Sequence, residues 1–177
     1  MDIGVIFDLR NPPEWRQDWN RLYGFTLEMC QEAERVGLDS VWFSEHHLFE
    51  DGYLTQPLTY MAAAAAVTTR VRLGTAILIG PLRSSVQLAE EATVVDILSG
   101  GRVELGLGAG YRIPEYELFG ADISTRYGAN DRRVRELREI FADPRHVPAP
   151  VNGTIPMYLG YQGPKGARRA GKLGAGL

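Results

Sequence analysis

The sequence has little of several features that mark large classes of proteins. Among its 177 residues Cys30 is the only cysteine, which excludes an internal disulfide framework and fits a reducing compartment. No apolar run reaches the ~18 residues that cross a bilayer, and the start at Met1–Gly4 lacks the basic region of a signal peptide. A formal net charge of -3 leaves no basic stripe for nucleic acid or anionic membrane. These absences predict a cytoplasmic protein that binds neither.

Strand and helix signals alternate along a chain of ordinary globular composition, with 45% hydrophobic and 23% charged residues. Short apolar runs predict strands at Ile3–Phe7, Leu38–Phe43, Arg72–Ile79, Val103–Leu107 and Ile155–Leu159. Helical spacing or high helix propensity predicts helices at Leu22–Val36, Pro57–Thr69, Ser84–Leu98, Asp131–Ala142 and Pro164–Leu173. One strand-helix unit roughly every 30–35 residues requires a parallel sheet with helical crossovers. An eight-stranded barrel and a doubly wound open sheet both satisfy this pattern.

Three short patterns predict local structure. Ser84, followed three residues later by Gln87, predicts a capping box at the start of a helix. Trp15, Trp19 and Tyr23 recur at near-helical spacing and predict ordinary packing in the core. Residues 142–154 carry prolines and show neither a helical nor a strand period, so we expect a linker there.

The segment after the second predicted strand carries Glu45, His46 and His47. In parallel α/β proteins this end of a strand is where ligands bind and chemistry occurs. Histidine titrates near neutral pH, so either imidazole can take and give a proton, and Glu45 can orient a neighbouring imidazole. A zinc site is disfavoured because the only other histidine lies in the linker, and no metal ligand is assigned. A structural role, with hydrogen-bonded histidines at a polar strand end, stays open.

A glycine-rich stretch, Gly106–Tyr111, follows the fourth predicted strand. A dinucleotide-binding fingerprint follows the first strand of its unit and opens a helix at once, and this stretch does neither. Glycine has no Cβ, so we interpret the stretch as a loop in which the backbone comes close to a flat ligand.

A second glycine-rich stretch, Gly160–Arg169, leads from the fifth predicted strand into a basic helix. The N-terminus of a helix attracts anions, and Lys165, Arg168 and Arg169 add positive charge. The segment is either a phosphate site, centred on Gln162–Lys165, or a solvated basic helix.

Taken in order, these motifs resemble the bacterial-luciferase-like family of flavin- and deazaflavin-dependent monooxygenases and oxidoreductases. Each motif alone is weak, whereas the ordered set, which covers nearly the whole chain, is specific. The matching segments are Gly37–His47, Arg72–Ala76, Asp96–Val103, Gly106–Gly110 and Gly163–Ala170. The resemblance implies an α/β fold of the TIM-type (β/α) barrel kind, with about the first five strand-helix units in this chain.

The resemblance also implies roles for individual residues. It implies reduced FMN, or a deazaflavin coenzyme in related branches, at the C-terminal face of the barrel. His46 matches a histidine that serves in proton transfer near the flavin, with His47 beside it. Ala76 and Ile77 match a bulged strand end, often with a cis peptide bond, on which the ring system rests. The other implied cofactor-binding residues are Gly108, Ala109 and Gly110 beside the flavin and Tyr161, Gln162 and Gly163 at its phosphate, to which the basic helix adds Lys165.

The chain departs from the family in length. Members are about twice as long, within the usual range for a complete barrel, so strands six to eight are absent from this sequence. Residues 142–154 are shorter than the insertion that members carry at that place. We therefore expect residues 1–177 to form a partial barrel domain, either from a longer protein or completed by another chain.

The function implied by the resemblance is that of a flavin-dependent monooxygenase, which uses reduced FMN and oxygen on a small organic substrate. Because no NAD(P)H site is evident, a separate flavin reductase is an expected partner, and a homodimer is the expected assembly. One alternative is a deazaflavin-dependent oxidoreductase that transfers hydride, with His46 managing a substrate proton. Another alternative is a truncated barrel that binds flavin without turnover.

Overall fold

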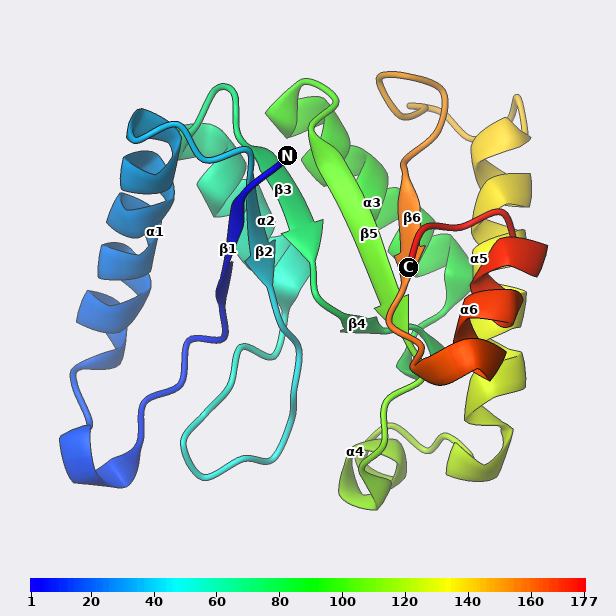
Figure 1. Cartoon of the computed structure of the whole chain (residues 1–177), viewed down its shortest axis with the longest axis horizontal. Coiled ribbons are helices and arrows are strands. Elements are labelled where there is room, and N and C mark those ends of the chain that lie inside the picture. The colour runs from blue at the N-terminus through cyan, green and yellow to red at the C-terminus, as the bar shows by residue number, and fades with distance from the viewer.

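Six parallel strands form one sheet in the computed structural model, which describes residues 1–177 (Figure 1). The strand order is β1-β2-β3-β5-β4, and β6 pairs with β5. The strands are β1 Gly4–Phe7, β2 Ser40–Phe43, β3 Arg72–Thr75, β4 Leu78–Ile79, β5 Val103–Gly108 and β6 Met157–Leu159. The helices are α1 Trp19–Arg35, α2 Pro57–Val67, α3 Ser85–Ser99, α4 Ile113–Leu118, α5 Arg126–Ala142 and α6 Gly163–Lys172.

The helices follow one another around the sheet in chain order. Helix α1 contacts α2, α2 contacts α3, and α3 contacts α5. In Figure 1, α2 and α3 lie behind the strands, with α1 and α5 at the two sides. No helix of the chain is both long and apolar enough to cross a membrane. All strands point the same way, so the loops that follow β2 and β5 gather at one end of the sheet, the lower end in Figure 1. The predicted parallel sheet with helical crossovers is confirmed.

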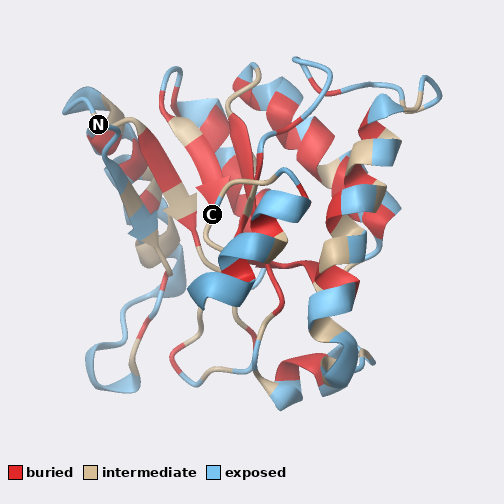
Figure 2. Ribbon diagram, turned by 45° about the vertical axis from the view of Figure 1, so that its right-hand side comes forward, coloured by how far each residue is buried: buried red, intermediate tan, exposed pale blue.

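The hydrophobic core lies between the strands and this layer of helices. Val41, Phe43 and Leu73 are completely buried and belong to a cluster of 31 buried residues. Figure 2 shows the buried residues on the strands and on the helix faces turned toward them. The opposite face of the sheet would be the inside of a barrel. There Ile6 is 56% exposed, because the strands of this chain do not close into a ring.

The third predicted strand is interrupted at a cis peptide bond. β3 ends at Thr75, β4 begins at Leu78, and the bond between Ala76 and Ile77 is cis. The structure therefore confirms the cis bond that the resemblance implies, and it corrects the prediction of one continuous strand over Arg72–Ile79. The sheet carries on across the break because both β3 and β4 pair with β5.

Several differences concern the helices. The capping box is wrong, because the side chain of Ser84 makes no capping hydrogen bond. Gln87 donates instead to Glu91, one turn further along α3, at 2.9 Å. Helix α5 begins at Arg126, before the predicted start at Asp131, and the sequence predicts no helix at the position of α4.

The aromatic residues near the N-terminus are less buried than predicted. Trp15 is 79% exposed and Trp19 is 41% exposed, so core packing is wrong for both. Trp19 packs against a loop, where a Cβ on Gly52 would lie 2.4 Å from its ring. Tyr23 alone packs against the core, with its ring 5.3 Å from that of Tyr60.

The segment between α5 and β6 contains no helix or strand, as predicted for a linker. Two contacts tie it to α3. Nε2 of His146 lies 3.0 Å from Oγ1 of Thr93, and the backbone N–H of Val151 donates to Oδ2 of Asp96 at 2.8 Å. These contacts hold the segment against the outer layer of helices and away from the C-terminal ends of the strands.

Candidate cofactor site

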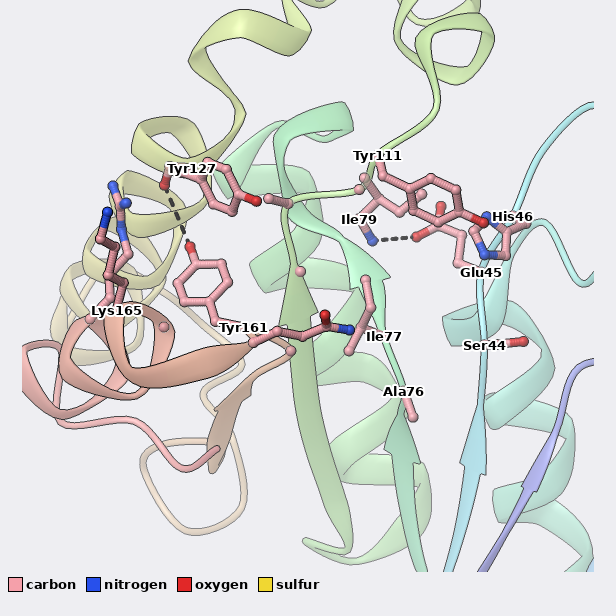
Figure 3. Close-up of a pocket in the computed structure, with 17 residues that line it drawn as sticks. Ser44, Glu45, His46, Ala76, Ile77, Ile79, Tyr111, Tyr127, Tyr161 and Lys165 are labelled. Atoms are coloured by element: carbon pink, nitrogen blue, oxygen red, sulfur yellow. Dashed lines mark hydrogen bonds between the residues drawn. The ribbon is translucent and has the colours of Figure 1, made fainter.

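A cavity of about 680 Å³ lies at the C-terminal ends of the strands (Figure 3). Its walls come from the loop after β2, the break between β3 and β4, the end of β5, and the turn from β6 into α6. Parallel strands end on the same side of a sheet, which explains why residues distant in sequence meet here. The volume falls within the ~300–1,000 Å³ that is usual for sites of small molecules and cofactors.

The structure brings the predicted site residues together in this cavity, except for His47 and Gly163. The predicted residues that line it are Glu45, His46, Ala76, Ile77, Gly108, Ala109, Gly110, Tyr161, Gln162 and Lys165. Gly163 instead occupies the first position of α6, just outside the lining. The remaining lining residues are Ser44, Ile79, Tyr111, Tyr127, Gly160, Gly166 and Arg169.

The adjacent histidines have different surroundings. The side chain of His46 lines the cavity and is 19% exposed, and its Nδ1 lies 2.9 Å from Oε1 of Glu115. The side chain of His47 is 5% exposed, and its Nε2 lies 2.9 Å from Oε1 of Glu45. Consecutive residues in extended backbone point to opposite sides. Of the two, only His46 is therefore placed to meet a ligand.

Glu45 is a fully buried carboxylate that joins the loop after β2 to the segment Ile79–Arg83. Its Oε1 accepts hydrogen bonds from Arg83 at 2.6 Å and from His47 at 2.9 Å. Its Oε2 accepts the backbone N–H of Ile79 at 2.7 Å, a bond drawn in Figure 3. An ionised carboxylate away from water requires such donors. The neighbouring imidazole that Glu45 orients is that of His47.

Ile77, which follows the cis bond, fills space that glycines leave open. A Cβ on Gly108 would lie 2.3 Å from Cδ1 of Ile77, and a Cβ on Gly160 would lie 2.7 Å from its Cγ2. Our interpretation of the glycine-rich stretch therefore changes at Gly108, because the missing Cβ makes room for a side chain of the protein. Figure 3 shows Ala76 and Ile77 between the two ends of the cavity.

The end of the cavity near α6 is cationic. Lys165 and Arg169 line it together with the rings of Tyr127 and Tyr161. Nε of Arg169 donates to Oδ2 of Asp131 at 2.5 Å, and its guanidinium carbon lies 5.6 Å and 5.8 Å from the centroids of the two tyrosine rings. This arrangement holds the guanidinium in place and leaves its Nη groups available to a ligand.

Tyr161 supports this arginine through the same carboxylate. Its hydroxyl donates to Oδ1 of Asp131 at 2.8 Å, while Oδ2 holds Arg169. Asn130 in turn donates to the hydroxyl at 3.0 Å. Burial raises the pKa of Tyr161, so the hydroxyl keeps its proton and its role as a donor at neutral pH.

Arg168, which the sequence analysis groups with the other basic residues of α6, is exposed and does not line the cavity. Residues that are adjacent in a helix point about 100° apart, so Arg168 and Arg169 cannot face the same site. Only Lys165 and Arg169 bring positive charge from α6 to the cavity.

Glu115, which contacts His46 from behind the cavity wall, is also a residue that sequence reasoning missed. It is fully buried on α4, whereas Glu117 on the same helix is exposed. Ile113 and Leu118, also on α4, are 57% and 54% exposed. The helix therefore buries a carboxylate next to Tyr116 and exposes two apolar side chains, which departs from the amphipathic pattern expected of a surface helix. No periodicity in the sequence distinguishes Glu115 from a solvated glutamate.

A protein-family comparison decides the relationship of the chain. The family model described as luciferase-like monooxygenase matches residues 1–177. The chain belongs to this family. The oxygenase component of a flavin-dependent trigonelline monooxygenase from Acinetobacter baylyi is 36% identical over 102 residues, which are 58% of this chain and 28% of the relative. An F420-dependent glucose-6-phosphate dehydrogenase from Amycolatopsis mediterranei is 30% identical over 172 residues, covering 85% of this chain and 51% of the relative.

Solved structures agree on the fold. The monooxygenase RslO1 from Streptomyces bottropensis has a TM-score of 0.91 and 24% identity, covering 99% of this chain and 58% of that one. The oxygenating constituent of 3,6-diketocamphane monooxygenase from Pseudomonas putida, in complex with FMN, has a TM-score of 0.84 and 21% identity, covering 99% and 56%. The chain is thus part of a TIM-type barrel, as the resemblance implies. It spans about half the length of these solved relatives.

Proposed function

We propose that this chain carries the cofactor site of a flavin-dependent monooxygenase that uses reduced FMN and oxygen on a small organic substrate. The polarity of the cavity carries the proposal (Figure 3). His46 lies at one end, Lys165 and Arg169 lie at the other, and Ala76 and Ile77 lie between them. Flavin mononucleotide has its parts in the same order, with a redox-active ring at one end and a phosphate at the other.

Each part of the cavity has a role toward that group. Lys165, the Nη groups of Arg169 and the N-terminus of α6 would bind the phosphate. The apolar side chain of Ile77 would support the ring system. When bound, the reduced flavin supplies the electrons that activate oxygen. His46 would hold or transfer a proton at the ring end of the site.

A second candidate is a deazaflavin-dependent oxidoreductase that transfers hydride. It is favoured by the dehydrogenase relative from Amycolatopsis mediterranei, which aligns with 85% of this chain at 30% identity. In that reaction His46 would handle the proton of a substrate hydroxyl or carbonyl.

We also propose partners for this protein. A monooxygenase of this kind receives reduced flavin from a separate reductase, and we propose such a reductase as a partner. We also propose that copies of the protein associate, as the sequence analysis expects for a homodimer. The small organic substrate would enter the cavity beside His46.

Titration of the protein with FMN and, separately, with a deazaflavin coenzyme tests the function. Fluorescence quenching reports binding of each. We expect FMN to bind, and Lys165→Ala and Arg169→Ala each to weaken binding about 10-fold through loss of a charge-assisted contact. The loss should be larger at low salt, because ionic strength screens exposed charges.

Arg168→Ala is the matched control, because it removes the same charge from the same helix outside the cavity. It should leave the affinity unchanged at every ionic strength. An equal loss of FMN affinity in Arg168→Ala and Arg169→Ala would mean that the basic helix attracts anions without a defined site. Tight binding of the deazaflavin with none of FMN would replace the first candidate by the second.

A further inference from the structure

Glu115 connects α4 to the loop that follows β2. Its Oε1 lies 2.9 Å from Nδ1 of His46 and accepts the backbone N–H of His47 at 2.9 Å. Nη1 of Arg112 lies 3.7 Å from the same oxygen and donates to the carbonyl of His47 at 2.6 Å. The position of Oε1 is therefore set by a backbone donor and a guanidinium as well as by His46.

This oxygen determines which ring nitrogen of His46 carries the proton. A carboxylate oxygen accepts hydrogen bonds, so Nδ1 has to donate. A neutral imidazole carries one ring proton, so Nε2 is left with its lone pair. Nε2 makes no hydrogen bond within the chain, and His46 lines the cavity. Edge-on contacts with Tyr53 and Tyr111, at centroid distances of 4.9 Å and 5.6 Å, restrict rotation of the ring.

His47 has the opposite arrangement. Its Nε2 lies 2.9 Å from Oε1 of Glu45, an oxygen that also accepts from Arg83. The proton of a neutral His47 therefore lies on Nε2. The two adjacent histidines differ in tautomer because a different carboxylate faces each of them.

The same contacts weigh against a role in packing alone. Glu115 is fully buried and its Oε2 has no hydrogen-bond partner. An unpaired acceptor in the interior costs stability, so a residue retained only to fill space is better served by an apolar side chain. What the carboxylate adds is an acceptor for Nδ1 of His46 and a negative charge beside the ring.

We propose that Glu115 is a positioning residue that holds neutral His46 as the Nδ1–H tautomer and thereby leaves Nε2 as the proton acceptor toward the cavity. The consequence for proton transfer rests on the proposed function. The tautomer itself requires neither cofactor nor turnover, so the two can be tested separately.

Nitrogen-15 NMR of the whole chain, labelled in its histidine rings and free of cofactor, tests the proposal. The chain has 3 histidines, and His46→Gln assigns the signals of His46 by their loss. At a pH where the rings are neutral, we expect His46 to be protonated on Nδ1 and His47 on Nε2. A parent protein with His46 protonated on Nε2 would overturn the proposal, whether or not the Glu115 variants fold.

Variants extend the test. Glu115→Ala removes the acceptor and should move His46 toward the Nε2–H form, which a free histidine side chain in water prefers. Glu115→Gln keeps an oxygen acceptor at the same place and should restore Nδ1–H. Glu117→Ala, on the exposed side of the same helix, should change nothing. An unchanged tautomer in folded Glu115→Ala would refute the role of Glu115.

Cofactor titration and turnover separate this inference from the proposed function. Failure of the parent to bind FMN or deazaflavin overturns the proposed function and leaves the tautomer result standing. With a bound cofactor, Glu115→Ala should lower kcat about 10- to 100-fold, as removal of the carboxylate that orients a metal-binding histidine typically does, with little change in cofactor affinity. Glu115→Gln should recover part of this rate, and a rate in Glu115→Ala equal to that of the parent would count against the proposal.

Discussion

His46 and His47 are the same residue type one position apart, yet their environments assign them different tasks. His46 is open to the cavity and shares an oxygen of Glu115 with the backbone of its neighbour. His47 is buried against Glu45, a carboxylate that also accepts hydrogen bonds from Arg83 and from the backbone N–H of Ile79. At this scale, the partner that each side chain meets determines its chemistry.

Replacement of each histidine by glutamine should separate these tasks. His46→Gln is expected to lower turnover by roughly 10²–10⁴, because glutamine keeps a hydrogen bond but cannot transfer the proton. Its unfolding midpoint and cofactor affinity should stay near those of the parent. His47→Gln should instead lower the urea midpoint, because its side chain is 5% exposed and bonded to Glu45. Parent-like turnover in His46→Gln would show that His46 is part of the scaffold.

At the scale of elements, the break between β3 and β4 borders the site. Hydrogen bonds to β2 and β5 hold the chain in place around this break. Oγ1 of Thr75 donates to the carbonyl of Gly106 at 2.8 Å, and the N–H of Ala76 donates to the carbonyl of Phe43 at 2.8 Å. A Cβ on Gly106 would lie 1.9 Å from the carbonyl oxygen of Thr75, which belongs to the backbone and cannot rotate away. β5 can therefore approach the break only with glycine at this position.

Gly106→Ala is expected to destabilise the fold by about 1–3 kcal/mol, the usual cost of overpacking a tight contact. It should also weaken cofactor binding, since the displaced segment borders the cavity. Gly24→Ala is the control, because a Cβ there meets nothing within 4 Å and the residue lies inside α1. That change should stabilise the protein by about 0.5–1 kcal/mol. Equal denaturation curves for Gly106→Ala and the parent would contradict the expectation.

A second connection between elements is sensitive to pH. Glu34 of α1 accepts the backbone N–H groups of Thr69, Arg70 and Val71, ahead of β3. Partial burial opposes ionisation of this carboxylate, but the hydrogen bonds outweigh it and lower the pKa of Glu34 from 4.5 to about 2. A group whose pKa is depressed by folding stabilises the native state above its unfolded pKa and loses that effect as pH falls.

Comparison of the parent with Glu34→Gln tests this connection. The difference in their free energies of unfolding should be full above about pH 4.5 and shrink as pH falls toward 2, the pKa in the folded state. Urea denaturation at several pH values measures it. Glu28→Gln alters an exposed carboxylate of the same helix and should show a much smaller difference. A difference in unfolding free energy between the parent and Glu34→Gln that stays constant down to pH 2 would show that ionisation of Glu34 does not stabilise the fold.

At the scale of the whole molecule, α3 exposes several apolar side chains on its outward side, next to Gln87 and Glu90. Leu88, Ala92 and Val95 are buried against the core, while Val94 and Leu98 are 52% and 58% exposed. Exposed apolar side chains that lie close together on a surface often mark a place where proteins associate. The outward face of α3 is therefore the place where we expect copies of the protein to associate.

Sedimentation velocity over a range of concentrations should show species heavier than the 19.6 kDa chain. Leu98→Lys places a charge on the outward face of α3 and should shift the population toward the monomer. Val151→Lys changes a residue that is 51% exposed in the segment after α5, and should leave the distribution as it is. A purely monomeric parent at all concentrations would end the proposal of a homo-oligomer.

The sequence alone determined the parallel α/β order, and its resemblance to a known family pointed to most of the residues that line the cavity. Hydrophobic runs, helix periodicity and glycine positions are local signals, and residues at the ends of parallel strands have to meet at one edge of the sheet. Ten residues, which the strand ends, the basic helix and the resemblance together predict, line the cavity.

Only the tertiary structure decided which side chains contact one another. A contact between segments that are distant in sequence does not alter the local pattern of hydrophobic residues. Glu115 meets His46 across 69 positions of the chain, and Arg169 reaches the cavity where Arg168 does not. The outcome for each of these side chains depends on how α4 and α6 are docked. That docking is set by burial and by hydrogen bonds made between distant segments, and these exist only once the chain has folded.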